Sequence, residues 1–200
     1  MAEKITIEIF RKKIPDELTK SLAEADSRTD IGSGAALSAA AASSYLIRAA
    51  ALTAQERGNS ELLDYLQRNG EILRSYMVHL IDEDVKSRGP LRKAMKEGDE
   101  QVIDAARQPA AAVANEIINM MNQLLELLEQ LSDVCSADAR RFVAASADLA
   151  MGAVRASMRY VLDLGAKSSD ETYRFIVKRE NEITLQNCGA LYARIQEKMK

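Results

Sequence analysis

The sequence predicts an all-α fold, a bundle of long helices joined by short connections. Apolar residues recur at intervals of three and four along most of the 200-residue chain, which is the period of a helix. Three prolines and nine glycines are too few for an all-β chain with many turns. Aromatic residues make up only 4% and tryptophan is absent, so the core must be built from Ala, Leu, Ile, Val and Met.

The first part of the chain is predicted to hold two short helical pieces, a glycine loop and one long helix. A helical turn at 6–13 is expected, although its alternating isoleucines also fit a strand. Proline followed by two acidic residues suits the first turn of a helix at 15–26. A loop at 27–33 leads into an alanine-rich helix at 35–57, whose small side chains would let another helix approach closely.

The middle of the chain is predicted to form three helices. A long amphipathic helix at 60–88 stops before Gly89-Pro90, because proline disfavours helical geometry in the preceding residue. A short helix at 91–97 follows, and then a long helix whose apolar stripe runs over 102–131. Pro109 should kink this long helix, since it removes a hydrogen-bond donor.

Two further helices complete the predicted bundle. Ser136 is a plausible cap for one that stops at Gly165, and Ser168 with Glu171 has the capping-box spacing that opens the last one. The residues predicted to face inward on this last helix are Ile176, Ile183, Leu191 and Ile195. Helices of this length expose too much apolar surface as one layer, so we expect one domain over 1–200 that forms a homodimer.

Composition excludes several classes of protein. A net charge of −3 argues against nucleic-acid binding. Arg48 interrupts the most apolar stretch, so no membrane span is expected, and the first residues lack the apolar run of a signal peptide. Cys135 and Cys188 are isolated, which fits a reducing cytoplasm better than a disulfide framework or a zinc site. The only histidine, His79, lies off the apolar stripe and is expected at the surface rather than as a catalytic base.

The most informative candidate for chemistry is Asp84. Helical spacing continues the apolar series that ends at Leu80 onto Asp84, which places this carboxyl group on the inward face. A buried carboxylate is costly unless it is paired or hydrogen-bonded, and burial raises its pKa toward a range useful for proton transfer. The alternative is a structural ion pair with Arg155 or Arg159.

A second candidate is the segment Gly32-Ser33-Gly34 ahead of the alanine-rich helix. Glycines let backbone approach a ligand, and free N–H groups at a helix start attract anions or carbonyl oxygens. A turn with a helix cap is the alternative interpretation. A third candidate is the pair Arg155 and Arg159, which lie one helical turn apart and would jointly meet a carboxylate ligand.

Several motifs in this order resemble a known family over nearly the whole chain. They are T-I-x-x-F at 6–10, G-S-G-A-A-L-S-A-A-A-A at 32–42, L-I-D-E-D at 80–84, A-x-x-P at 106–109 and V-A-A at 143–145. The chain thereby resembles the formiminotetrahydrofolate cyclodeaminase and methenyltetrahydrofolate cyclohydrolase family. The resemblance implies an all-α homodimer that acts on one-carbon folates, opening the methenyl bridge with water or closing a formimino group to methenyl with loss of ammonia.

The resemblance also implies roles for particular residues. Asp84 would transfer the proton, assisted by Asp82, since both match the aspartates of the family's L-x-D-x-D-A helix. The segment 32–34 stands where the family has a P-G-G-G-S loop, and would cradle the folate at the dimer interface.

The basic residues would serve the anionic tail of the folate. Arg57 keeps the positive charge of the family's lysine-rich step, and it or the Arg155/Arg159 pair would contact that tail. The substrate would be a tetrahydrofolate derivative, with no metal and no tightly bound cofactor, in a cytoplasmic enzyme. The alternative is a helical dimer of the same fold that has lost catalysis and binds a ligand or a partner.

Overall fold

The computed structural model describes residues 15–24 and 29–200, and within these ranges every regular element is an α-helix. In chain order they are α2 (Pro15–Ala23), α3 (Ile31–Arg57), α4 (Glu61–Ser87), α5 (Gly89–Glu97), α6 (Glu100–Val134), α7 (Arg140–Ala166) and α8 (Glu171–Lys198). The predicted all-α class is therefore confirmed for the described part of the chain. The turn expected at 6–13 lies outside the described residues.

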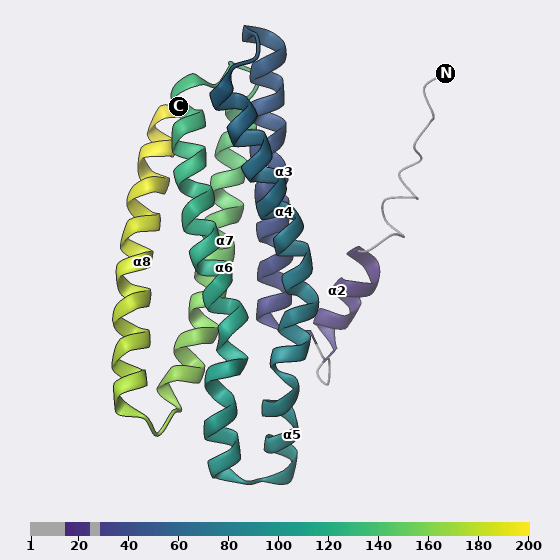
Figure 1. The fold of residues 1–200 in the computed structure, drawn as a ribbon, viewed down its shortest axis with the longest axis vertical. Helices are drawn as coiled ribbons and strands as arrows, with labels where there is room; N and C mark the ends of the chain where they lie inside the picture. Colours follow the sequence, from purple (N-terminus) through teal and green to yellow (C-terminus); the bar gives the residue numbers. More distant parts are fainter. Residues whose placement is uncertain (1–14, 25–28) are drawn as a thin grey trace.

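The long helices α3, α4, α6, α7 and α8 run side by side along the long axis of the molecule (Figure 1). Helix α3 packs against α4 and α7, and α6 packs against α4, α7 and α8. The short α5 lies at one end, between α4 and α6 in the chain, while α2 lies beside the start of α3. Helix α6 continues through Pro109, so the kink there stays a prediction, as does the homodimer.

The alanine-rich helix packs as closely as its small side chains predict. Several alanines of α3, Ala42 among them, are fully buried. The hydroxyl of Ser146 on α7 donates a hydrogen bond to the backbone oxygen of Ala42 at 2.6 Å, and Ser38 of α3 donates to the backbone oxygen of Leu149 at 3.2 Å. Side chains of one helix thus reach the backbone of the other, which larger residues at this contact would prevent.

Helix α3 is also the one helix among the described residues that is long and apolar enough to cross a membrane, judged by length and composition. Half of its most apolar stretch is buried inside the bundle. The central helix of a packed bundle passes the same test, so this property by itself does not indicate a membrane span.

Two predicted helix caps are wrong, because both helices begin later than the serines expected to cap them. Ser136 is buried and its backbone N–H donates to the hydroxyl of Thr53 at 3.2 Å, while α7 starts after Ala139 without a side-chain cap. Helix α8 is capped by Asp170, whose carboxylate accepts from the N–H three residues on, and not by Ser168. An aspartate next to the first turn is an equally good cap, and spacing alone does not choose between them.

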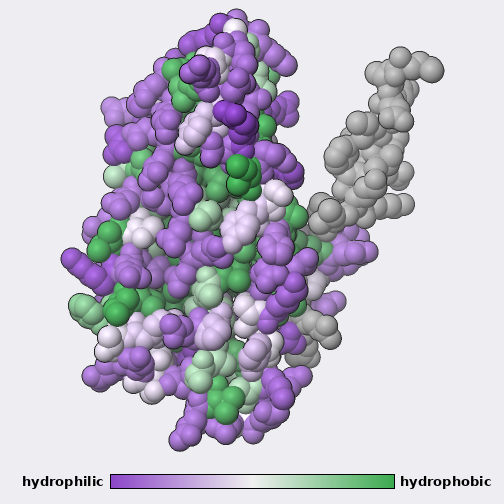
Figure 2. All heavy atoms as spheres, viewed as in Figure 1, coloured by the Kyte–Doolittle hydropathy of each residue, from purple (hydrophilic) through white to green (hydrophobic). Residues whose placement is uncertain are grey.

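The inward face predicted for α8 is half wrong. Leu191 and Ile195 are buried as expected, but Ile176 and Ile183 are each 43% exposed. The buried side of α8 begins instead at Val177, because this helix lies on the flank of the bundle and packs mainly against α6 and α7. Figure 2 shows other exposed apolar residues scattered among polar ones on one face of the molecule.

Candidate functional site

Asp84 of α4 is fully buried, as the sequence predicts. It follows Met77 and Leu80 on the inward stripe of the helix, and its side chain points toward the first turn of α3. A carboxyl group at this place needs hydrogen-bond donors, since a buried ionised group without partners is strongly disfavoured.

Ser33 supplies these donors to one of the two carboxyl oxygens. Its backbone N–H donates to Oδ2 of Asp84 at 2.9 Å and its hydroxyl donates to the same atom at 2.7 Å. The other oxygen, Oδ1, is buried and has no hydrogen-bond partner. Burial raises the pKa of Asp84 above its ordinary value of 3.8, although the hydrogen bonds from Ser33 and the charge of Arg88 lower it in part.

Gly32 makes this close contact between α3 and α4 possible. A Cβ atom at this position would lie 2.1 Å from Oδ1 of Asp84 and 2.6 Å from its Cγ, so any side chain would displace the carboxyl group. Gly34 has no such constraint, because a Cβ there would meet only the side chain of Leu22 at 3.7 Å, an ordinary contact.

The segment 32–34 is part of a helix and not of a loop, which corrects the sequence prediction. Helix α3 begins at Ile31, and the carboxylate of Asp30 caps it by accepting from the N–H of Ile31 at 2.7 Å. The glycines concealed this start, because glycine normally disfavours a helix. Here Gly32 is required by its contact with Asp84, and the helix is stabilised by its cap and by packing.

A second group of polar side chains lies beside Asp84 and was not predicted. Arg88, one turn beyond Asp84, forms an ion pair with Asp30, and its Nε donates to the hydroxyl of Tyr160 on α7 at 2.8 Å. The guanidinium carbon lies 5.5 Å from the centre of the Tyr160 ring. Burial raises the pKa of Tyr160 to about 12, so this hydroxyl is neutral at physiological pH. The spacing of four between Asp84 and Arg88 is the sequence signal from which this group could have been predicted.

An open cleft of about 320 Å³ borders this group. Its lining includes Asp30, Arg88 and Gly34, together with Leu22 of α2. The start of α3 and the end of α4 therefore combine a buried carboxyl group, a partly buried guanidinium and a space open to solvent.

The other predicted site residues lie apart from Asp84. Asp82 is exposed on α4. Arg57 is at the far end of α3, about 37 Å from Gly32 at ~1.5 Å per residue, where its guanidinium donates to the backbone oxygen of Val134 at 3.0 Å. The structure therefore does not bring Arg57 to the buried carboxyl within one subunit.

Arg155 and Arg159 are both exposed on α7, one turn apart, so the suggested ion pair with Asp84 is wrong. The residue after Arg159, Tyr160, is the one that faces inward, since neighbouring positions on a helix differ in direction by about 100°. His79 is exposed, as expected, and its Nε2 lies 3.6 Å from Oε1 of Glu83 on the same helix.

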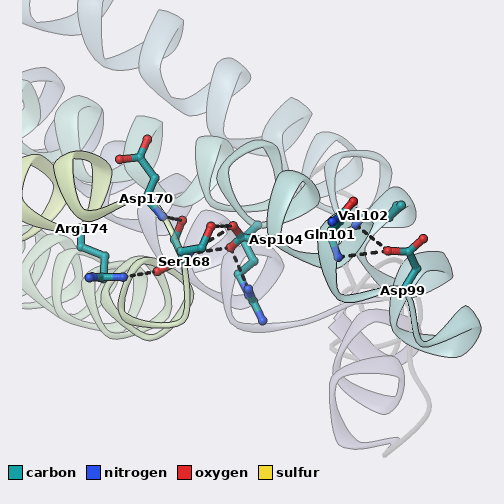
Figure 3. A network of polar contacts seen from close by, with 9 residues as sticks. Asp99, Gln101, Val102, Asp104, Ser168, Asp170 and Arg174 are labelled. Atoms are coloured by element: carbon teal, nitrogen blue, oxygen red, sulfur yellow. Dashed lines mark hydrogen bonds and ion pairs between the residues drawn. The ribbon is translucent and has the colours of Figure 1, made fainter.

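A separate polar cluster joins α6 to the turn before α8 and is partly exposed to solvent (Figure 3). Asp104 accepts from the backbone N–H of Ser169 at 3.0 Å and from its hydroxyl, and pairs with Arg107 at 2.8 Å. Arg174 donates to the backbone oxygen of Ser168 at 2.6 Å. The contacts with Ser169 and Arg107 lower the pKa of Asp104 to about 2. These are contacts that fasten a turn, with each acidic and basic group already paired.

The architecture is similar to that of a known protein. The fold matches the crystal structure of formiminotetrahydrofolate cyclodeaminase from Thermotoga maritima with a TM-score of 0.86. The match covers 96% of this chain and 97% of that one, at 22% sequence identity. No curated protein matches the chain in sequence.

The sequence itself carries the assignment to a family. Residues 15–182 match the sequence model described as formiminotransferase-cyclodeaminase, a span that contains Gly32, Ser33, Asp84, Arg88 and Tyr160. The chain belongs to the formiminotransferase-cyclodeaminase family.

Proposed function

We propose that the chain is an enzyme of one-carbon folate chemistry that uses Asp84 to transfer a proton. Two reactions fit. In one, N10 of a formiminotetrahydrofolate adds to the formimino carbon and ammonia leaves; in the other, water adds to the methenyl carbon and one C–N bond of the bridge opens. The observation that carries the proposal is the buried carboxyl of Asp84, with one oxygen held by Ser33 and the other free.

The environment of Asp84 suits an acid–base role. A carboxyl group whose pKa is raised by burial holds a proton at higher pH than a surface aspartate and can return it to a leaving nitrogen. Ser33 fixes Oδ2, and we assign the proton transfer to Oδ1, which packs against Gly32 and has no hydrogen-bond partner. The chemistry needs an acid–base group and stabilisation of a cationic centre, and it needs neither a metal nor a tightly bound cofactor.

The remaining predicted residues have no assigned role within one subunit. Asp82, Arg57, Arg155 and Arg159 are exposed, whereas the carboxyl group of Asp84 is buried. In the proposed site, Gly32 and Ser33 lie in the first turn of α3 and position Asp84. From the sequence we expect them instead to form a loop that cradles the substrate.

A second candidate function is a ligand-binding module of the same fold without catalysis. Asp84 is fully buried in the subunit, and its contact with Ser33 and Gly32 also fastens α4 to α3. If that were its only task, the protein would bind a folate or another ligand without converting it.

Turnover of two substrates tests the proposal. Purified protein is mixed with methenyltetrahydrofolate, whose absorbance decay is followed, and separately with formiminotetrahydrofolate, from which ammonia release is measured. We expect one of these rates to exceed that of buffer, and Asp84→Asn to lower it by about 100-fold, the usual size of an acid–base contribution.

Thermal unfolding with and without 5-formyltetrahydrofolate separates the two candidates. A melting temperature that rises with this ligand while neither substrate turns over supports the binding module. Rates equal to buffer and no rise in melting temperature would contradict the enzyme and a folate-binding module alike, since a ligand that binds only the folded state must stabilise it.

A further inference from the structure

Two buried polar atoms near the start of α3 have no hydrogen-bond partner, namely Oδ1 of Asp84 and Nη1 of Arg88. Buried polar atoms in proteins are nearly always paired, so an unpaired one calls for an explanation. Here one atom is an acceptor or proton carrier and the other is a donor. They belong to residues one turn apart on the same helix, and the backbone N–H of Arg88 donates to the backbone oxygen of Asp84 at 3.2 Å.

The orientation of the guanidinium is fixed by its other contacts. Nη2 pairs with Asp30, Nε donates to the hydroxyl of Tyr160 at 2.8 Å, and the side chain is only 12% exposed. A planar guanidinium held on two of its nitrogens leaves the third nitrogen at a defined position. Such a donor binds an incoming oxygen without losing further side-chain freedom.

The charges around Arg88 indicate which kind of oxygen it receives. One cation, Arg88, lies near two carboxyl groups, those of Asp30 and Asp84. The charge of Arg88 lowers the pKa of Asp84, and both carboxyl groups raise the pKa of Tyr160. Asp30 already balances the charge of Arg88, and Asp84 adds a negative charge whenever it is ionised. A further carboxylate from a ligand would be repelled, whereas a neutral carbonyl oxygen accepts from Nη1 without that cost.

We propose that Nη1 of Arg88 binds the amide-type carbonyl oxygen of the folate ring system, beside the carboxyl of Asp84, and that Tyr160 and Asp30 hold the guanidinium for this contact. This inference rests on the proposed function, because it assigns a part of the folate to that same site. Arg88 and Asp30 line the 320 Å³ cleft, so a ring that enters it lies beside the side chain of Arg88, and its carbonyl reaches the buried Nη1 when the groups that cover this nitrogen move aside. Arg88 then recognises the ring and not the glutamyl tail.

A comparison of two ligands tests this assignment. One ligand is 5-formyltetrahydrofolate, and the other is a tetrahydropterin that lacks the aminobenzoyl-glutamate tail. Their dissociation constants are measured by calorimetry for wild type, Arg88→Met, and the control Arg92→Met, which removes a guanidinium one turn further along. We expect Arg88→Met to weaken both ligands by the same factor, about 10- to 100-fold, and Arg92→Met to change neither.

Further variants keep the test decisive if Arg88→Met does not fold. Arg88→Lys retains a cation opposite Asp30 but not the planar donor, and should weaken both ligands to a similar extent. Tyr160→Phe loosens the guanidinium while keeping the ring, and should weaken both by about 3- to 10-fold.

The possible outcomes separate the two proposals. A wild type that binds neither ligand and turns over no folate overturns the proposed function and this inference with it. If wild type binds folate and the Arg88 variants bind it with the same dissociation constant, the inference alone is overturned. A loss confined to the ligand with the tail overturns it too, because Arg88 would then contact a tail carboxylate.

Discussion

Asp84 on α4 and Asp104 on α6 each accept hydrogen bonds from the backbone N–H and the hydroxyl of one serine, Ser33 and Ser169 respectively. Each also has an arginine close by, at the fourth position after Asp84 and the third after Asp104. Yet the pKa of Asp84 is raised and that of Asp104 is lowered to about 2. The same kind of contact therefore has opposite outcomes.

Solvent makes the difference. Asp84 is completely buried, so removing its charge from water outweighs the stabilisation that Ser33 and Arg88 provide. The side chain of Asp104 is 21% exposed and keeps part of its hydration, so its hydrogen bonds and the ion pair with Arg107 dominate. Asp104 is a satisfied structural contact, whereas Asp84 retains an unpaired oxygen.

The largest expected effect comes from the glycine that lets Asp84 pack. Gly32→Ala places a Cβ atom 2.1 Å from Oδ1 of Asp84, which forces the carboxyl and Ser33 apart. We expect the free energy of unfolding, measured with urea, to fall by about 3 kcal/mol through overpacking and lost buried hydrogen bonds.

Gly34→Ala is the matched control in the same helical turn. Its Cβ meets Leu22 at 3.7 Å, so alanine fits and raises stability by up to about 1 kcal/mol through helix propensity. Equal effects of the two substitutions would show that the close approach of α3 to Asp84 does not exist in solution.

Much of this fold follows from periodicity, while the site follows from contacts that periodicity does not encode. The spacing of apolar residues located the long helices and placed Asp84 inward, because a helix face is a property of one segment. The partner of Asp84 is Ser33, which lies 51 residues away in sequence and on a helix whose start two glycines concealed. No pattern within either segment specifies that pairing.

Arginines illustrate the same limit. Arg155 and Arg159 were grouped because they lie one turn apart, but both face solvent. Arg88 lies one turn from Asp84 on α4. It faces inward because its guanidinium pairs with Asp30 and donates to the hydroxyl of Tyr160. Which of several basic residues meets a buried acid depends on the neighbouring helices.

The second prediction concerns the pH dependence of stability, which should differ in sign between the two aspartates. The raised pKa of Asp84 means that its contribution favours folding below pH 3.8 and is lost as the pH rises through the raised value. Relative to wild type, Asp84→Asn should therefore gain stability as the pH rises above 3.8. Urea unfolding of both proteins over a series of pH values measures this difference.

Asp104→Asn provides the opposite case. The folded-state pKa of Asp104 is about 2, so its contribution is present above pH 3.8 and is lost as the pH falls toward 2. Relative to wild type, this variant should lose stability as the pH rises from 2 to 4. Slopes of the same sign for the two variants would mean that burial does not control the titration of Asp84.

The smallest expected effect isolates the hydroxyl of Ser33. Ser33→Ala keeps the backbone N–H that donates to Oδ2 of Asp84 and removes the hydroxyl donor at 2.7 Å, so stability should fall by about 1 kcal/mol. Because that hydrogen bond lowers the pKa of Asp84, its loss should raise the pKa further, as an NMR titration of the carboxyl carbon would show.

Ser43→Ala is the control, since this buried hydroxyl donates only to the backbone oxygen of Ala39 in its own helix, at 3.0 Å. It should leave the titration of Asp84 unchanged. Ser169→Ala should likewise raise the pKa of Asp104 from about 2 toward 3.8, because the Ser169 hydroxyl is the largest contribution that holds it low. A different result would be an unchanged pKa of Asp84 in Ser33→Ala together with a raised pKa of Asp104 in Ser169→Ala. The contact between α3 and α4 would then be looser than the contact between Asp104 and the turn before α8. Asp84 would then owe its raised pKa to burial alone.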